Sequence, residues 1–119
     1  MAATNINRVI ITGNLTRDPE LRYAESGKAV APMRIAVPRA GDGDDADFFD
    51  VVAFGQLAEA CATHLTKGRQ VLIEGTLRQQ SWSDSESGER RSRVEVLANR
   101  VQFLDAPRRE EAEATPDAA

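Results

Sequence analysis

The hydrophobic pattern of this chain changes its period once, at Gly55. Upstream of this glycine, apolar and polar residues alternate one by one in three stretches, which are residues 7–15, 29–38 and 48–54. The same alternation returns downstream in two longer stretches, about 70–82 and 91–104. Because side chains along a strand point to opposite faces in turn, each stretch predicts a strand with one buried face and one exposed face.

The segment between the third and fourth stretches has a helical period instead. Leu57, Cys61 and Leu65 recur every four residues, which places them on one face of a short amphipathic helix. Lys67 and Gly68 then supply a basic last turn and a glycine suited to ending a helix. Three strands, one helix and two strands are the element order of an OB fold. We therefore expect an all-β, five-stranded OB-fold barrel with one short helix between strands 3 and 4.

The last predicted strand must contain one irregularity. Val94, Val96 and Ala98 share one parity along this strand, whereas Val101 and Phe103 have the other. One β-bulge between the two groups would bring all of these side chains to the same buried face.

The aromatic residues indicate which faces of the sheet stay open. In the third strand, Asp50 shares its face with Phe48 and Phe54. An unpaired aspartate is a poor core residue, so we expect this face to be exposed and Asp50 to orient a basic partner. Phe49, on the opposite face, is expected in the core together with Phe103.

The fourth strand divides its side chains in the same way. Four residues are expected to face inward, namely Val71, Ile73, Gly75 and Leu77. Arg78, Gln80 and Trp82 then fall outside. Flat rings exposed beside arginines are suited to stacking unpaired bases while the arginines hold the phosphates. The pattern therefore indicates a protein that binds single-stranded nucleic acid.

Each aromatic residue on these faces also has a structural interpretation. Trp82 could instead pack over a barrel end, and Phe54 could tuck under the helix, because Gly55 follows it at a strand end. Tyr23 could either stack on a base or cap the barrel.

Length and composition limit the classes of protein that fit. A chain of 119 residues with 41% hydrophobic and 29% charged side chains is typical of one globular domain. We expect this domain to span residues 1–104 and to be followed by an acidic, disordered tail at 105–119. The net charge of −4 lies mostly in that tail, so it neither supports nor excludes nucleic-acid binding. A single cysteine and the lack of a secretory signal or membrane span favour a cytoplasmic location.

Three blocks of sequence resemble those of a known family. They are residues 13–23 (GNLTRDPELRY), 54–59 (FGQLAE) and 67–78, which include IEGTLR. In this order they resemble the bacterial single-stranded DNA-binding protein (SSB) family, and the likeness extends over about residues 5–104. It implies an OB fold, usually a homotetramer, that coats single-stranded DNA in replication, recombination and repair without catalysis. It also implies association with the nucleoid.

The resemblance further implies which residues contact DNA. The stacking aromatics of the family match Trp82, Phe54 and, in place of a tryptophan, Phe48. Its basic contact on the first strand matches Arg8. Outward-facing arginines add four candidates, namely Arg34, Arg78, Arg91 and Arg93. Any one of these arginines could be an ordinary solvated charge, whereas several on strands beside rings favour binding by the group.

The chain departs from the family pattern in two places. Another family tryptophan would fall near Gly41, where this chain has an aspartate-rich loop, so one stacking position is expected to be missing. The chain ends in TPDAA instead of the family's Ile-Pro-Phe tip. The apolar anchor that recruits replication and repair enzymes is therefore missing, and we expect a short, secondary paralogue.

Two other classes of protein are alternatives to this interpretation. A related OB protein of the primosome, acting mainly through protein partners, is the alternative. A barrel nuclease would need clustered carboxylates with a metal, or a base beside a nucleophile, whereas the candidate acids lie mostly in one loop. We expect no enzyme activity, no metal and no cofactor. DNA or RNA remains open as the ligand, because stacking does not read the 2′-hydroxyl.

Overall fold

Residues 4–41, 43 and 45–104 are described by a computed structural model. The elements follow the order β1 (Val9–Leu15), β2 (Arg22–Tyr23), β3 (Ala29–Pro38), β4 (Ala46–Phe54), α1 (Gly55–His64), β5 (Gln70–Ser83) and β6 (Arg90–Phe103). Every predicted strand and the predicted helix is present, with ends displaced by about two residues at most. The two-residue strand β2 was not predicted. The expected tail, 105–119, lies outside the described residues.

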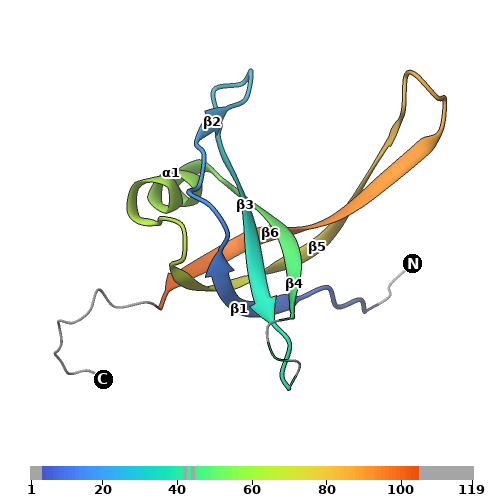
Figure 1. Ribbon diagram of the computed structural model, residues 1–119. Coiled ribbons are helices and arrows are strands. Elements are labelled where there is room, and N and C mark those ends of the chain that lie inside the picture. Colours follow the sequence, from blue (N-terminus) through green and yellow to red (C-terminus); the bar gives the residue numbers. More distant parts are fainter. Residues whose placement is uncertain (1–3, 42, 44, 105–119) are drawn as a thin grey trace, which may run out of the picture.

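The strands form one sheet that closes into a ring. Hydrogen-bonded neighbours follow the order β1–β5–β6–β4–β3–β2, and an additional pairing of β1 with β3 joins the two sides (Figure 1). This closing contact is short and pairs Asn14 with Ala36 and Leu15 with Ile35. The expected OB-fold class is confirmed, and the helix falls between β4 and β5 because β2 adds one strand to the count.

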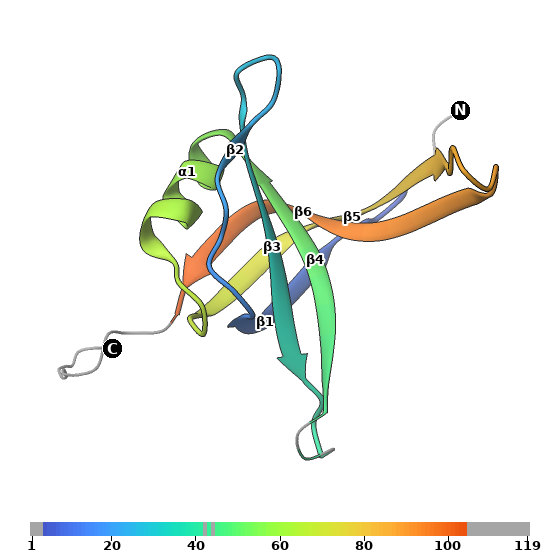
Figure 2. The same ribbon diagram turned by 45° about the horizontal axis from the view of Figure 1, so that its top comes forward.

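Gly55 explains why the hydrophobic period changes where it does. Its φ of 66° lies in the left-handed region, which glycine adopts without steric cost, and this lets the chain turn from β4 directly into α1. The helix packs against β3, β4 and β6 at one side of the ring (Figure 2). Its residues Ala58 and Cys61 are fully buried, as expected for an amphipathic helix that covers a sheet.

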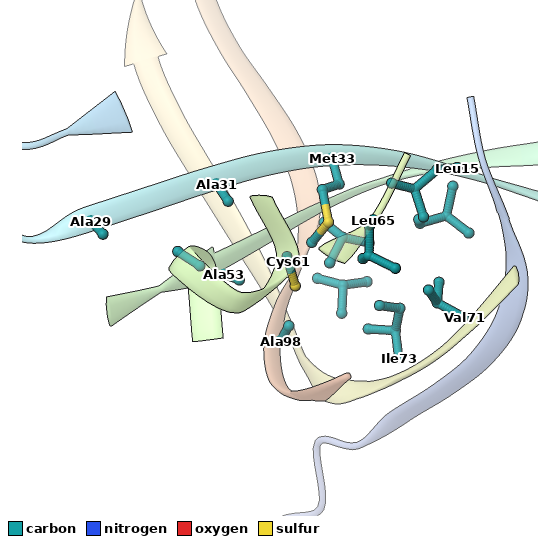
Figure 3. Close-up of a cluster of buried hydrophobic side chains, with 14 residues drawn as sticks. Leu15, Ala29, Ala31, Met33, Ala53, Cys61, Leu65, Val71, Ile73 and Ala98 are labelled. Atoms are coloured by element: carbon teal, nitrogen blue, oxygen red, sulfur yellow. The ribbon is translucent and has the colours of Figure 1, made fainter. Parts of the chain in front are cut away.

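The core fills the inside of the ring and the space beneath α1. Figure 3 shows side chains from both halves of the sheet meeting there, including Met33 of β3 and Ile73 of β5, with Cys61 of α1. Val71 and Ile73 are completely buried, so the inward face predicted for this part of β5 is confirmed. Cys61 is a core residue, as predicted.

The predicted bulge is present in β6. Glu74 pairs with Arg100, but the next residue, Gly75, pairs with Ala98, so Asn99 is the extra residue. Gly75 allows the two strands to approach closely here, because a Cβ at this position would lie 2.0 Å from the carbonyl oxygen of Leu97. The parity change between Ala98 and Val101 is thereby explained.

Four side chains predicted to be buried are exposed instead. The exposed fractions are 56% for Val94, 48% for Leu77, 38% for Phe49 and 37% for Phe103. For Leu77 and Val94, the reason is the length of their hairpin. The β1–β5 pairing runs only from Asn14 and Gln70 to Val9 and Gly75, whereas the β5–β6 pairing continues to the end of β5. The far part of this hairpin projects from the ring as an arm whose inner face is left uncovered (Figure 2).

The same reasoning applies to the two phenylalanines. The β4–β6 pairing is confined to Val51 and Val52, so Phe49 lies on the part of the β3–β4 hairpin that extends past the closed ring. Phe103 is the last residue of β6, and its ring lies 6.1 Å from that of His64 at the end of α1. Strand parity predicts the correct face of the strand for these side chains. A side chain on that face is buried only where another element covers it.

Candidate nucleic-acid interface

The outer face of the β3–β4 hairpin carries the first ring and a charged pair. The register sets Arg34 opposite Asp50 and Ala36 opposite Phe48. Arg34 Nη1 donates to Asp50 Oδ1 at 3.1 Å, so the predicted basic partner of Asp50 is present. The guanidinium carbon of Arg34 also lies 5.4 Å from the centre of the Phe48 ring, within the range of a cation–π contact. Phe48 remains 52% exposed.

The second ring, Phe54, lies at the end of β4 between two cations. Lys28 Nζ is 5.2 Å from the ring centre, and the guanidinium carbon of Arg78 is 5.9 Å from it. Phe54 is half-buried, so part of the ring stays accessible. Sequence reasoning missed Lys28, because it precedes β3 in a turn and shows no strand periodicity.

The third ring, Trp82, lies on the arm formed by β5 and β6. The antiparallel register sets Trp82 opposite Arg91 and Gln80 opposite Arg93, on the same face of the hairpin. Trp82 is 44% exposed and lines an open hollow of about 550 Å³ with Gln80, Ser81 and Arg93. A hollow beside an exposed indole has the shape needed to receive a flat base.

Arg91 is held at the tip of the arm by carboxylates. Its Nε lies 3.1 Å from Asp84 Oδ2, and its Nη2 lies 3.7 Å from Glu89 Oε1. The backbone N–H groups of Glu86 and Ser87 lower the pKa of Asp84, with a smaller contribution from Arg91, so this carboxylate is charged at neutral pH.

A buried carboxylate lies between the second and third rings. Glu95 of β6 is only 6% exposed and accepts hydrogen bonds at Oε2 from Arg78 Nη2 at 2.9 Å and Gln80 Nε2 at 2.8 Å. Arg93 Nη2 lies 3.7 Å from Oε1 of the same carboxylate. Sequence reasoning missed Glu95, although its parity with Arg91 and Arg93 places it on the outward face.

A hollow of about 380 Å³ joins the two hairpins. Asp50 and Phe54 of β4 line it together with Arg78, Gln80, Arg93 and Glu95 of the arm. Arg17 and Arg22, from the segment before β3, line it as well, and neither belonged to the candidates from the sequence. Among the described residues, Arg17 makes no ion pair, whereas Arg22 pairs with Glu20 at 2.6 Å.

We call this continuous surface the aromatic face. It consists of Arg34, Phe48, Asp50, Phe54, Arg78, Gln80, Trp82, Arg91, Arg93 and Glu95. Seven of the eight candidate residues from the sequence lie on it. Three rings, spread over two hairpins, thus alternate with arginines along one side of the molecule.

Arg8 does not lie on the aromatic face. Its Nη2 forms an ion pair with Glu74, and Arg100 Nη1 lies 3.9 Å from the same carboxylate. Arg8 lines a separate hollow of about 570 Å³ with residues such as Asn99 and Arg100, and this hollow shares no lining residue with the one beside Phe54. The other seven candidates therefore lie on the aromatic face, and Arg8 lies outside it.

Groups typical of catalytic centres are scarce in the part of the chain that the structure describes. No group of three or more His, Cys, Asp or Glu side chains there is arranged to hold a metal ion. Burial raises the pKa of the Cys61 thiol to about 11, so this thiol stays protonated at neutral pH. No helix within the described residues is both long and apolar enough to cross a bilayer.

Known proteins resemble this chain over most of its length. It is 50% identical over 105 residues to a single-stranded DNA-binding protein of Thermotoga maritima and 46% identical over 106 residues to one of Wolinella succinogenes. It is also 37% identical over 107 residues to one of Borreliella burgdorferi. These matches cover 83%, 84% and 86% of this chain, and 74%, 65% and 72% of the respective relatives. The chain thus spans about two thirds to three quarters of their length.

A family model matches the same region. The single-strand binding protein family aligns with residues 6–104, which include every strand and the helix described above. The three sequence blocks that carry the resemblance and the closed sheet with one helix agree with this match. The chain belongs to the single-strand binding protein family.

Proposed function

We propose that this chain binds single-stranded DNA without sequence preference and protects it during replication, recombination and repair. The observation that carries the proposal is the aromatic face, on which Phe48, Phe54 and Trp82 are accessible beside arginines. The names of its relatives, each a single-stranded DNA-binding protein, support DNA as the ligand. Binding is the whole function in this proposal, with no reaction catalysed and no cofactor required.

Stacking supplies the sequence-tolerant part of the affinity. Every base has a flat face, and a base that stacks on an aromatic side chain contributes ~1–3 kcal/mol. Trp82 and Phe54 are the strongest candidates, because hollows open beside both rings. Phe48 extends the path along the β3–β4 hairpin.

Phosphate contacts supply the salt-dependent part. All four arginines of the aromatic face are paired with a carboxylate, but a guanidinium has five N–H donors and can bond a phosphate while it keeps that partner. Each neutralised phosphate contributes a slope of about −0.7 in log K against log salt for single strands. We include Arg17 and Arg22 among the contacts because they line the hollow, and Lys28 because its ammonium group lies over the Phe54 ring. Arg8 is proposed as a further contact outside the aromatic face.

We further propose that the chain acts as a homo-oligomer, with a tetramer as the expected form. One subunit offers three rings, so tight binding requires several subunits to engage the same strand, where effective concentration strengthens each later contact. Two features of β1 support self-association. Ile10 is 56% exposed, and one edge of Val9–Gly13 pairs with no strand among the described residues. A cytoplasmic, nucleoid-associated location accords with this function.

Competition between single-stranded and duplex DNA tests the proposal. Fluorescence anisotropy with a labelled oligothymidine should show saturable binding that unlabelled single strands displace and that a duplex of equal length displaces poorly. Equal affinity for both forms, or none for either, would instead favour a primosomal protein that acts mainly through protein partners.

A further inference from the structure

Glu95 is the only buried charged side chain among the residues that the structure describes, and its surroundings are unusual for a surface that binds DNA. It is a member of the aromatic face, where phosphates are proposed to bind, and carries the same sign of charge as they do. A carboxylate in this place lowers the local positive potential. Its presence therefore calls for a function other than attraction of the ligand.

The contacts of Glu95 indicate what that function is. Three donors from two strands converge on its carboxylate, namely the guanidinium groups of Arg78 and Arg93 and the amide of Gln80. The carboxylate is below the surface, whereas the side chains of Arg78 and Arg93 remain 40% and 54% exposed. Glu95 thus contacts each guanidinium from beneath and leaves part of it accessible to solvent.

The buried carboxylate and the exposed arginines stabilise each other. A buried charge is tolerated when it is paired and hydrogen-bonded, which these donors provide. The pairing also orders the arginines. An arginine side chain that is held at one nitrogen has lost much of its conformational entropy in the unbound protein, so the entropy cost of ordering it on ligand binding is smaller. In both contacts the guanidinium uses its Nη2 atom. Arg78 Nε is buried, so Nη1 is the nitrogen that Arg78 has left for a ligand, whereas Arg93 has Nε and Nη1.

We propose that Glu95 is a positioning residue for nucleic-acid binding, which holds Arg78, Gln80 and Arg93 in place between the rings of Phe54 and Trp82. This inference rests on the proposed function. It assigns to a negative charge a favourable effect on the binding of a polyanion. The carboxylate does not touch the ligand and acts through the side chains that it orders.

The inference makes a prediction opposite to that of simple electrostatics. If Glu95 were only a counter-charge, its neutralisation would strengthen DNA binding. If it positions the arginines, Glu95→Gln weakens binding, because the carboxamide loses the charge that holds both guanidinium groups, and its NH2 group would face Arg93 Nη2, which now lies 3.7 Å from a carboxylate oxygen. The matched control is Glu59→Gln, which removes one negative charge from an exposed side chain on α1, outside the aromatic face.

The first experiment measures the affinity of the full chain and both variants for oligothymidine, with thermal melting to verify folding. We expect Glu95→Gln to weaken binding about three- to tenfold, on the scale of one ordinary hydrogen bond. Glu59→Gln should leave binding unchanged or make it slightly tighter. Equal or tighter binding by Glu95→Gln would overturn the inference. Failure of the unsubstituted chain to bind would instead reject the proposed function.

The second experiment separates positioning from a general effect on the fold. In the Arg78→Ala, Arg93→Ala background, Glu95→Gln should no longer weaken binding, since the arginines through which Glu95 acts are gone. If Glu95→Gln weakens binding by the same factor in this background as in the unsubstituted chain, the inference is contradicted.

A third measurement needs no variant. Nuclear magnetic resonance of the arginine side chains should show slow rotation of the Arg78 and Arg93 guanidinium groups before and after oligothymidine is added. Free rotation in the unbound protein would contradict the inference even if Glu95→Gln failed to fold.

Discussion

The guanidinium carbon of Arg78, on β5, lies 5.9 Å from the centre of the Phe54 ring, at the end of β4. This contact joins β5 to β4, which are separated by β6 in the sheet order. Arg78 also donates to Glu95 of β6. It therefore links the two hairpins that carry the rings.

Arg78→Ala is expected to reduce the salt dependence of DNA binding. The loss of one phosphate contact should lower the magnitude of the slope of log K against log salt by about 0.7. Anisotropy titrations with oligothymidine at several salt concentrations measure this slope. Lys67→Ala removes one positive charge from the loop after α1, outside the aromatic face, and serves as the control. An unchanged slope for Arg78→Ala would remove Arg78 from the proposed contacts.

Trp82→Ala should weaken binding to every single-stranded sequence by a similar factor. The lost stacking contact corresponds to ~1–3 kcal/mol, and it depends little on the base because all bases have a flat face. Affinities for oligothymidine, oligoadenine and mixed sequences measure the effect, and Trp82→Phe, which keeps a ring, should recover part of it. A loss restricted to one base would indicate recognition of base edges instead.

Gly75→Ala should destabilise the fold at the bulge. The added Cβ would meet the Leu97 carbonyl oxygen at 2.0 Å, and this backbone atom cannot move without disturbing the β5–β6 pairing. A loss of about 1–3 kcal/mol in the free energy of unfolding is expected, as for other overpacked sites. Urea denaturation measures it, with Thr76→Ala at the neighbouring, half-buried position as the control. Similar midpoints for Gly75→Ala and the unsubstituted chain would contradict the close approach.

Cys61 should make stability fall at high pH. Burial raises the pKa of its thiol from 9.0 to about 11, so the unfolded chain loses this proton at a lower pH than the folded chain does. The contribution is therefore fully present below about pH 9 and is lost as pH rises toward 11, with a total on the order of 2–3 kcal/mol. Urea denaturation at pH 8 to 11 should show a steeper loss for the unsubstituted chain than for Cys61→Ala. Parallel curves would show that the thiol is not linked to folding.

Much of the fold could be predicted because strand parity reports local geometry. Parity identified Val71 and Ile73 as core residues and required the bulge that Asn99 provides. The burial predicted for Leu77 from the same rule was wrong. A side chain on this face is buried only where β1 lies alongside β5, and the sequence around Leu77 does not show where the β1–β5 pairing ends.

The candidate site was predictable in part for a similar reason. Rings and arginines on regular strands could be placed on one face from their spacing, as for Trp82 and Arg93. Lys28 and Arg17 come from irregular segments, so only the folded chain brings Lys28 to the Phe54 ring and Arg17 to the hollow. Arg8 was assigned by resemblance, and its partner Glu74 became known only from the register of β1 and β5.

The central claim is that exposed rings on this closed sheet receive the bases of a single strand. The chain has one tryptophan, so fluorescence excited at wavelengths that Tyr23 does not absorb reports on Trp82 alone. Titration with oligothymidine at low salt should quench this emission in a saturable manner as bases stack on the indole. Unchanged emission throughout the titration would contradict the claim.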